Sequence, residues 1–232
     1  HISTTIFARF PVTKTSLDII TDFEIIIWTT TPWTMPGNRA VAYGKDIDYS
    51  LIEVTNVGEN SLAKIGDKII IAKELVEDVM KEISVLSFNS SNTLKGSDFA
   101  GTVLAHPLNN NGYEHEVLLL EADFVTTDQG TGFVHIAPGH GADDFELGRQ
   151  NNLPIPETVS DNGILNSNLP LLGGLRVLKD NEIIADIMSE HNALIGRGKL
   201  NHSYPHSWRS KAPLVFRTTP QWFISMTTNN LR

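Results

Sequence analysis

Two short segments of the sequence combine hydroxyl, imidazole and carboxylate side chains with residues that restrict or free the backbone. Residues 28–38 read Trp-Thr-Thr-Thr-Pro-Trp-Thr-Met-Pro-Gly-Asn, and residues 130–144 read Gly-Thr-Gly-Phe-Val-His-Ile-Ala-Pro-Gly-His-Gly-Ala-Asp-Asp. Proline fixes φ and glycine permits turns that other residues avoid, so the polar side chains between them are held in defined places. This pattern is typical of a small polar site.

The first segment places five candidate residues close together. They are four hydroxyl side chains and one amide: Thr29, Thr30, Thr31, Thr34 and Asn38. A threonine hydroxyl both donates and accepts hydrogen bonds, so the cluster could hold a water molecule and a polar group of a substrate. Threonine also favours strands, and this segment alone favours that structural interpretation. Asn38 is equally typical of a turn.

The second segment supplies His135, His140, Asp143 and Asp144. His135 ends a predicted strand, where a core position and a site position fit equally well. Asp143 and Asp144 fall in the first turn of a predicted helix, where acidic side chains are favourable whether or not they bind a substrate. The four side chains could also bind a metal ion, but a five-residue histidine spacing without cysteine matches zinc sites poorly, so a metal-dependent hydrolase is the weaker alternative. A Ser-His-Asp hydrolase is weaker still because the Gly-x-Ser-x-Gly motif is missing.

Together the two segments resemble the signature segments of the editing (CP1) domain inserted into isoleucyl-tRNA synthetases, which are class I enzymes. The likeness rests on the triple threonine, Pro-Trp-Thr and Pro-Gly-Asn of the first segment and on Gly-Thr-Gly-x-Val-His-x-Ala-Pro-Gly-His-Gly-x-Asp-Asp of the second. It extends over most of the chain, including residues 204–209 and 220–223, which resemble the stretch where the insertion rejoins the synthetase body. Valyl and leucyl synthetases share part of this pattern but are expected to replace His135 and Pro-Gly-His-Gly.

The resemblance implies an aminoacyl-tRNA deacylase that hydrolyses the ester of valine wrongly attached to isoleucine tRNA, with valyl-adenylate as a further candidate substrate. It implies that the four threonines position the ester and the attacking water and that Asp144 binds the α-ammonium group. It also implies that Asn38 contacts the terminal ribose and that His135 limits the size of the amino-acid side chain. The implied substrate-binding residues are Trp28, Trp33, Asn38, His135 and His140, although the two tryptophans fit the core equally well. No metal ligand is implied. The alternative from another functional class is a non-catalytic tRNA-docking module.

Charge and composition limit the partners. The chain has 18 Lys and Arg against 27 Asp and Glu, a formal net charge of −9, so by itself it should bind RNA weakly. We therefore expect the remainder of the synthetase to supply most of the affinity for isoleucine tRNA, while this chain receives the aminoacylated 3' end. The sequence has no Gly-x-x-x-x-Gly-Lys loop, so ATP and magnesium are expected only in a catalytic domain outside it. The absence of cysteine and of a long apolar run favours a cytoplasmic chain without a membrane segment, and we expect a monomer.

The distribution of apolar residues predicts an α+β fold, in which short strands form a curved sheet or β-barrel core and helices lie at the periphery. Strands are expected at residues 5–12, 23–29, 39–43, 49–54, 68–72, 116–122 and 132–136. Helices are expected at residues 73–83, 142–150 and 180–194. Strands and helices do not alternate regularly, which disfavours a doubly wound dinucleotide fold.

The chain is expected to contain one domain and a tail. Residues 1–200 are predicted to form the editing domain, and residues 201–232, rich in aromatic residues and proline, a connecting segment that returns to the synthetase body. Because the sequence begins at His1 without methionine and ends within an apolar pattern, we interpret it as part of a longer protein.

Overall fold

The first strand, β1 (Ile2–Lys14), is buried along most of its length, and the other elements are arranged around it. The computed structural model describes residues 1–228, and in it every residue of β1 from Ser3 to Phe10 is buried. β1 pairs antiparallel with β2, β7 and β10. A strand that is covered on both faces is expected at the centre of a fold, and β1 occupies that position.

The strands form one mixed sheet. Their bounds are β2 (Glu24–Thr29), β3 (Ala40–Tyr43), β4 (Asp48–Val57), β5 (Lys68–Ala72), β6 (Val85–Lys95), β7 (Val103–Ala105), β8 (Glu116–Glu121), β9 (Phe133–Ile136) and β10 (Leu194–Asn201). The strand order is β6-β4-β5-β2-β1-β7-β8-β3-β9, with β10 joined to β1 beside this path. The β2–β5 and β3–β8 pairs are parallel, whereas the other pairs are antiparallel.

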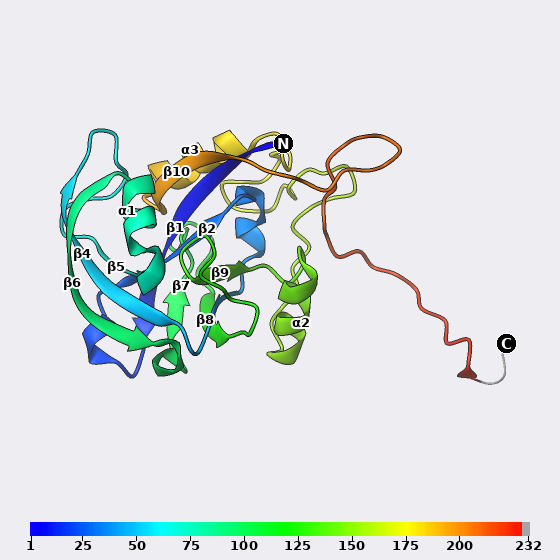
Figure 1. Ribbon diagram of the computed structural model, residues 1–232. Helices are drawn as coiled ribbons and strands as arrows, with labels where there is room; N and C mark the ends of the chain where they lie inside the picture. Colours follow the sequence, from blue (N-terminus) through cyan, green and yellow to red (C-terminus); the bar gives the residue numbers. More distant parts are fainter. Residues whose placement is uncertain (229–232) are drawn as a thin grey trace.

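Short helices lie around the sheet (Figure 1). The α-helices are α1 (Val76–Glu82), α2 (Ala142–Gln150) and α3 (Asn181–Glu190), and the 3-10 helices are η1 (Asp18–Ile20), η2 (Pro32–Gly37), η3 (Lys73–Leu75) and η4 (Gly96–Phe99). α1 packs against β6, and α3 packs against β1, β10 and η2. Within residues 1–228, none of the helices has the length and apolar character needed to cross a membrane.

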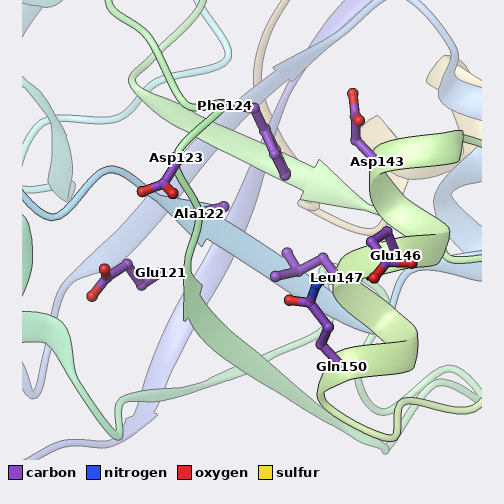
Figure 2. A pocket seen from close by; sticks show the side chains of 8 residues that line it. All are labelled: Glu121, Ala122, Asp123, Phe124, Asp143, Glu146, Leu147 and Gln150. Carbon is purple, nitrogen blue, oxygen red and sulfur yellow. Dashed lines mark hydrogen bonds between the residues drawn. The ribbon is translucent and has the colours of Figure 1, made fainter.

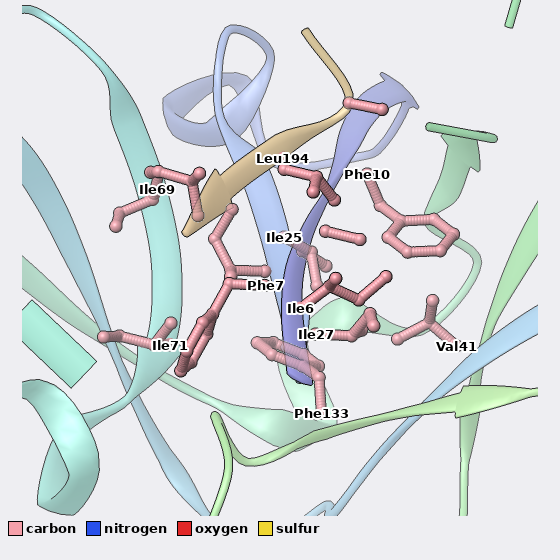
Figure 3. Close-up of a cluster of buried hydrophobic side chains, with 14 of the residues drawn as sticks. Ile6, Phe7, Phe10, Ile25, Ile27, Val41, Ile69, Ile71, Phe133 and Leu194 are labelled. Atoms are coloured by element: carbon pink, nitrogen blue, oxygen red, sulfur yellow. The ribbon is translucent and has the colours of Figure 1, made fainter. Parts of the chain in front are cut away.

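The main hydrophobic core lies between the curved strands. Its central side chains come from neighbouring strands of the sheet and converge in Figure 3: Ile6, Phe7, Phe10, Ile25, Ile27, Val41, Ile69, Ile71, Phe133 and Leu194. Most of these side chains are β-branched or aromatic, types that fill a pleated surface well. The core therefore holds β2, which leads into the first polar segment, and β9, which lies within the second.

The predicted fold class is confirmed. The structure has a curved α+β sheet with peripheral helices, and the sheet is open because, among the described strands, its pairing path does not close. All seven predicted strands are present, six of them with shifted ends and β5 with the predicted bounds, and the helix predicted at residues 142–150 is α2. Residues 73–83 divide into η3 and α1, so that prediction was correct in place but wrong in helix type over its first turn.

Three strands were not predicted: β6, β7 and β10. β6 lies at an edge of the sheet next to β4, and its exposed polar residues conceal it from a search for apolar alternation. The helix predicted at residues 180–194 ends at Glu190, and Leu194 instead begins β10, because β1 offers that segment a pairing partner. Tertiary pairing overrides the local helical pattern at this point.

After β10 the chain has little regular structure and extends away from the sheet (Figure 1). Part of this segment folds back, because Thr218 N–H donates to the carbonyl of Gly139 at 2.9 Å and Arg217 pairs with Asp161. The division into residues 1–200 and a connecting segment 201–232 stays a prediction, and residues 229–232 of that segment lie outside the described residues.

Gly132 in the second polar segment fits a place that has no room for a side chain. Its φ is +78°, in the left-handed region, and a Cβ there would lie 2.3 Å from the Cβ of Ala72. At the same place Ala72 N–H donates to the carbonyl of Thr131 at 2.8 Å, which ties the end of β5 to the start of β9. Glycine is therefore required where these two strands approach.

We expect Gly132→Ala to lower the free energy of unfolding by about 3 kcal/mol, because it adds a steric clash to an unfavourable φ. Gly174→Ala is the matched control, since Gly174 has a φ of +86° but no atom within 4 Å of the place that a Cβ would take. It should cost only about 1 kcal/mol. Urea denaturation of both variants measures the difference, and equal losses would contradict the packing explanation.

Candidate active site

The two polar segments meet at one cavity of about 220 Å³. The cavity lies where β2 ends, η2 turns, β9 ends and α2 begins, and it is lined by Trp28, Thr29, Thr31, Thr34, Val134, His135, Ala137, His140 and Asp144. Thr34 and His135 are 101 positions apart in the sequence but both line this cavity and are hydrogen-bonded to each other. The structure thus brings together most of the residues that the sequence singled out.

The threonines form a connected cluster at the end of β2. Thr29 Oγ1 lies 3.1 Å from Thr31 Oγ1 and accepts the Thr31 N–H at 3.1 Å. Thr34 Oγ1 donates to the carbonyl of Thr31 at 2.8 Å, and Thr34 N–H donates to the same carbonyl at 2.9 Å, which closes the first turn of η2. This turn follows β2 directly because proline at position 32 begins η2 and cannot continue a strand ladder.

Thr30 does not line the cavity, unlike Thr29 and Thr31. Strand alternation does not account for this difference, because the successive residues Trp28 and Thr29 both line the cavity. Its place among the catalytic threonines therefore stays a prediction, and the cavity lining gives it no direct support.

His135 forms one wall of the cavity and is 8% exposed. Its Nε2 lies 2.9 Å from Thr34 Oγ1, and its Nδ1 lies 2.7 Å from Asn38 Nδ2. Burial lowers the pKa of His135 to about 3, so the imidazole is neutral near pH 7.

Asn38 and Trp33 stand behind the cavity and do not line it. Asn38 is 0% exposed, and Trp33 is 2% exposed, with its ring edge-on to His140 at a centroid distance of 5.0 Å. The predicted contact of Asn38 with a ribose does not agree with this burial, because His135 lies between Asn38 and the cavity. Of the two tryptophans, Trp28 lines the cavity and Trp33 belongs to the core.

His140 lines the cavity and also anchors the loop before α2. Its Nδ1 donates to the carbonyl of Phe216 at 3.1 Å, and its Nε2 accepts from Thr158 Oγ1 at 2.7 Å. Burial lowers the pKa of His140 and favours this neutral state. Thr158 and Phe216 carry no motif signal in the sequence, because they reach the site only through the long-range folding of the chain.

Asp144 lies in the first turn of α2, which begins after Gly141. Its Oδ2 accepts the backbone N–H of Ala137 at 2.8 Å. Burial raises the pKa of Asp144, although the hydrogen bond to Ala137 opposes that shift. A Cβ on Gly141 would lie 2.7 Å from Asp144 Oδ1, so glycine leaves the room that this carboxylate occupies.

Asp143 points away from Asp144 and lines a different hollow of about 310 Å³. Figure 2 shows Asp143 and Glu146 on α2, across from Asp123 and Phe124. This arrangement separates the acidic pair into one site residue and one surface residue.

The four side chains considered as metal ligands do not converge. Asp143 lies in the other hollow, and both ring nitrogens of His135 are engaged by Asn38 and Thr34. Among residues 1–228 no group of three or more His, Cys, Asp or Glu side chains is placed to hold a metal ion. Nothing in this donor set therefore favours the metal-dependent alternative.

The turn at residues 106–108, outside the two polar segments, contacts η2. His106 is 1% exposed, its Nε2 donates to the carbonyl of Met35 at 3.0 Å, and its Nδ1 accepts the N–H of Leu108 at 3.1 Å. Burial lowers the pKa of His106 to about 3. The position of η2 therefore depends on a second neutral histidine, which belongs to neither of the two polar segments.

Comparison with known proteins identifies the family. A family model described as the leucyl-tRNA synthetase editing domain matches residues 53–169. The chain is 46% identical over 232 residues to the isoleucine-tRNA ligase of Pelagibacter ubique, covering 100% of this chain and 25% of that protein. It is also 46% identical to the isoleucine-tRNA ligase of Gluconobacter oxydans, covering 97% of this chain and 25% of that protein. The chain thus spans about a quarter of the length of these curated relatives.

Two solved structures share the fold. The structure described as "The crystal structure of GlLeuRS-CP1" has a TM-score of 0.60 and 13% identity, covering 87% of this chain and 100% of that chain. The cytosolic leucyl-tRNA synthetase editing domain of P. falciparum has a TM-score of 0.50 and 11% identity, covering 64% of this chain and 67% of that chain. At these identities the likeness concerns the fold alone.

The two buried histidines predict how stability depends on pH. The pKa of His106 and His135 is about 3 in the folded chain and about 6.5 when exposed, so between these values the unfolded chain binds protons that the folded chain does not. The free energy of unfolding should therefore fall as the pH drops below 6.5, by about 1.4 kcal/mol per pH unit for each histidine. Urea denaturation between pH 7 and pH 5 measures this slope.

The variant His106→Gln serves as the comparison, because it removes one of the two groups. Its slope between pH 6.5 and pH 5 should be smaller by about one proton, whatever its stability at pH 7. Identical slopes for the variant and the natural chain would show that His106 is not held neutral by the fold.

Proposed function

The chain belongs to the family of aminoacyl-tRNA synthetase editing domains, and we propose that it hydrolyses the ester that joins valine to isoleucine tRNA. The observation that carries this proposal is the shared cavity, which is lined by Thr29, Thr31 and Thr34 on one side and by Asp144 on the other. The choice of isoleucine tRNA in this proposal follows from the relatives, because the proteins to which the chain is 46% identical are isoleucine-tRNA ligases. In this proposal the remainder of a synthetase is the partner and the cytoplasm is the place of action.

An editing site of this kind is needed because binding alone discriminates poorly between isoleucine and valine. One methylene in an apolar pocket changes a binding free energy by only about 1–3 kcal/mol, and isoleucyl enzymes facing valine are the standard example of this limit. A second cavity that accepts valine and excludes isoleucine removes the error by hydrolysis. Size exclusion suits this task because a rigid wall rejects a larger side chain more strongly than a matching pocket favours it.

Asp144 is suited to bind the α-ammonium group of the substrate. Its carboxylate lines the cavity, and among the described residues it has no Lys or Arg partner. A charge-assisted hydrogen bond to an ammonium group would supply that partner and orient the ester. The raised pKa of Asp144 follows from burial, and a bound cation would lower it again.

The threonines are suited to hold the ester and the attacking water. Thr29 Oγ1 and Thr31 Oγ1 border the cavity, and each hydroxyl can donate and accept. An ester is already activated, so positioning by fixed hydroxyl groups can lower the barrier without a strong base in the protein. His135 is not available as that base because both of its ring nitrogens are engaged.

Most of the affinity for tRNA is assigned to other parts of a synthetase. The net charge of −9 opposes binding of a phosphate backbone to this chain by itself. The α2 surface beside the cavity is acidic as well, with Asp143 and Glu146 facing Asp123. The acylated end must therefore enter the cavity while the rest of the acceptor strand is held elsewhere.

We expect Asp144→Ala in the full-length synthetase to reduce hydrolysis of valyl-tRNA at least 100-fold, since the ammonium group loses its only charged partner. Asp143→Ala is the matched control, because it removes the neighbouring carboxylate outside the cavity and should change the rate less than 3-fold. Deacylation of preformed valyl-tRNA measures both. Normal hydrolysis by the Asp144 variant would refute the ammonium role, and no hydrolysis by the natural enzyme would favour the docking module.

We expect His135→Ala to allow hydrolysis of isoleucyl-tRNA, because removal of the imidazole enlarges the cavity at its wall. The rate on isoleucyl-tRNA should rise at least 10-fold relative to the natural enzyme, while valyl-tRNA is still hydrolysed. Parallel deacylation assays with the two substrates measure the ratio. An unchanged ratio in a folded variant would remove the size-limit role of His135.

A further inference from the structure

A continuous hydrogen-bond chain runs from Asn38 through His135 to Thr34. Asn38 Nδ2 lies 2.7 Å from His135 Nδ1 and 2.8 Å from the carbonyl oxygen of Ala40. A carbonyl oxygen only accepts hydrogen bonds, so the amide must direct its nitrogen to this side. His135 Nδ1 is therefore the acceptor and carries no proton.

Turning the Asn38 amide by 180° would be less favourable. It would place Asn38 Oδ1 against the carbonyl oxygen of Ala40 and leave the amide nitrogen on the side where, among the described residues, Oδ1 now has no partner. Two opposed buried oxygens and two unused N–H groups cost more than one unpartnered oxygen. The orientation shown is thus the favourable one.

The other end of the chain leads independently to the same protonation state. Thr34 Oγ1 lies 2.8 Å from the carbonyl oxygen of Thr31 and 2.9 Å from His135 Nε2. The single hydroxyl proton of Thr34 is donated to the carbonyl, so His135 Nε2 must donate to the hydroxyl. Both ends therefore require the proton of His135 on Nε2.

Asn38 is itself held firmly in place. Its side chain is 0% exposed, and its backbone carbonyl accepts hydrogen bonds from His115 Nε2 at 3.0 Å and from Arg39. It caps the C-terminal end of η2, where its N–H donates to the carbonyl of Met35 at 3.0 Å. Because it does not line the cavity, Asn38 can affect a substrate only through the group that it touches.

We propose that Asn38 is a positioning residue that fixes His135 as the neutral tautomer protonated on Nε2, and that this contact sets the ring orientation limiting the size of the substrate. The size limit rests on the proposed editing function, whereas the tautomer does not. The assignment also gives the buried amide a role different from the ribose contact implied by the family resemblance.

The tautomer is tested first, without any substrate. In the chain labelled with 15N at histidine, NMR correlation of ring nitrogens with ring protons distinguishes the two neutral tautomers, and His135→Gln identifies the signal. At pH 7 we expect the natural chain to show a protonated Nε2 and an unprotonated Nδ1 at His135. In Asn38→Asp the carboxylate accepts from Nδ1, so the ring should become protonated there.

Thr34→Val covers the case in which Asn38→Asp does not fold. This variant removes the Thr34 contact but leaves Asn38 Nδ2 facing Nδ1, so the tautomer protonated on Nε2 should persist. A natural chain protonated on Nδ1, or a Thr34→Val variant that loses the Nε2 proton, would overturn the proposal.

The effect on selectivity is tested in the full-length synthetase. Asn38→Asp and Asn38→Ser should raise the ratio of isoleucyl-tRNA to valyl-tRNA hydrolysis at least 10-fold, because the wall at His135 is no longer fixed. An equal change for both substrates with an unchanged tautomer would refute the positioning role. Failure of the natural enzyme to hydrolyse valyl-tRNA would instead refute the proposed function, and the NMR result would still stand by itself.

Discussion

The contact of His135 with Thr34 and Asn38 holds the site together, because it joins two segments that are far apart in the sequence. η2 follows β2, and His135 belongs to β9, so neither segment can shift without breaking a buried hydrogen bond. In this network one imidazole serves the Thr34 hydroxyl and the Asn38 amide nitrogen at once, and among the described residues only the amide oxygen of Asn38 is left without a partner. The burial that makes these bonds strong also keeps the imidazole uncharged.

The sequence predicted those parts of the site that depend on motif chemistry. Thr31, His135 and Asp144 were singled out from residue type, and they do share one cavity. Strand alternation alone would not have separated Thr30 from the other threonines, because the successive residues Trp28 and Thr29 both line the cavity. The burial of Trp33 and Asn38 was not available, because orientation within a 3-10 turn depends on what packs behind it.

The sequence was sufficient to predict the fold class, but it was not sufficient to predict β6 at one edge of the sheet. Strands rich in β-branched residues, such as β2 and β5, are evident from composition, whereas β6 is polar and exposed and is held by its pairing with β4. Long-range supports such as the contact of His106 with Met35 leave no local pattern, because the two residues are 71 positions apart. The elements that place the site were therefore visible in the sequence, but the contacts that brace it were not.

The return of residues 216–218 to the loop that carries His140 affects where the domain can be divided. Phe216 and Thr218 lie well beyond β10, yet they form hydrogen bonds with His140 and Gly139, and Arg217 pairs with Asp161. A fragment cut after β10 would keep the whole sheet and every residue that lines the cavity. It would nevertheless lose residues 216–218, whose hydrogen bonds and ion pair hold the loop before α2, so an assay of that fragment would test a site with one wall unsupported.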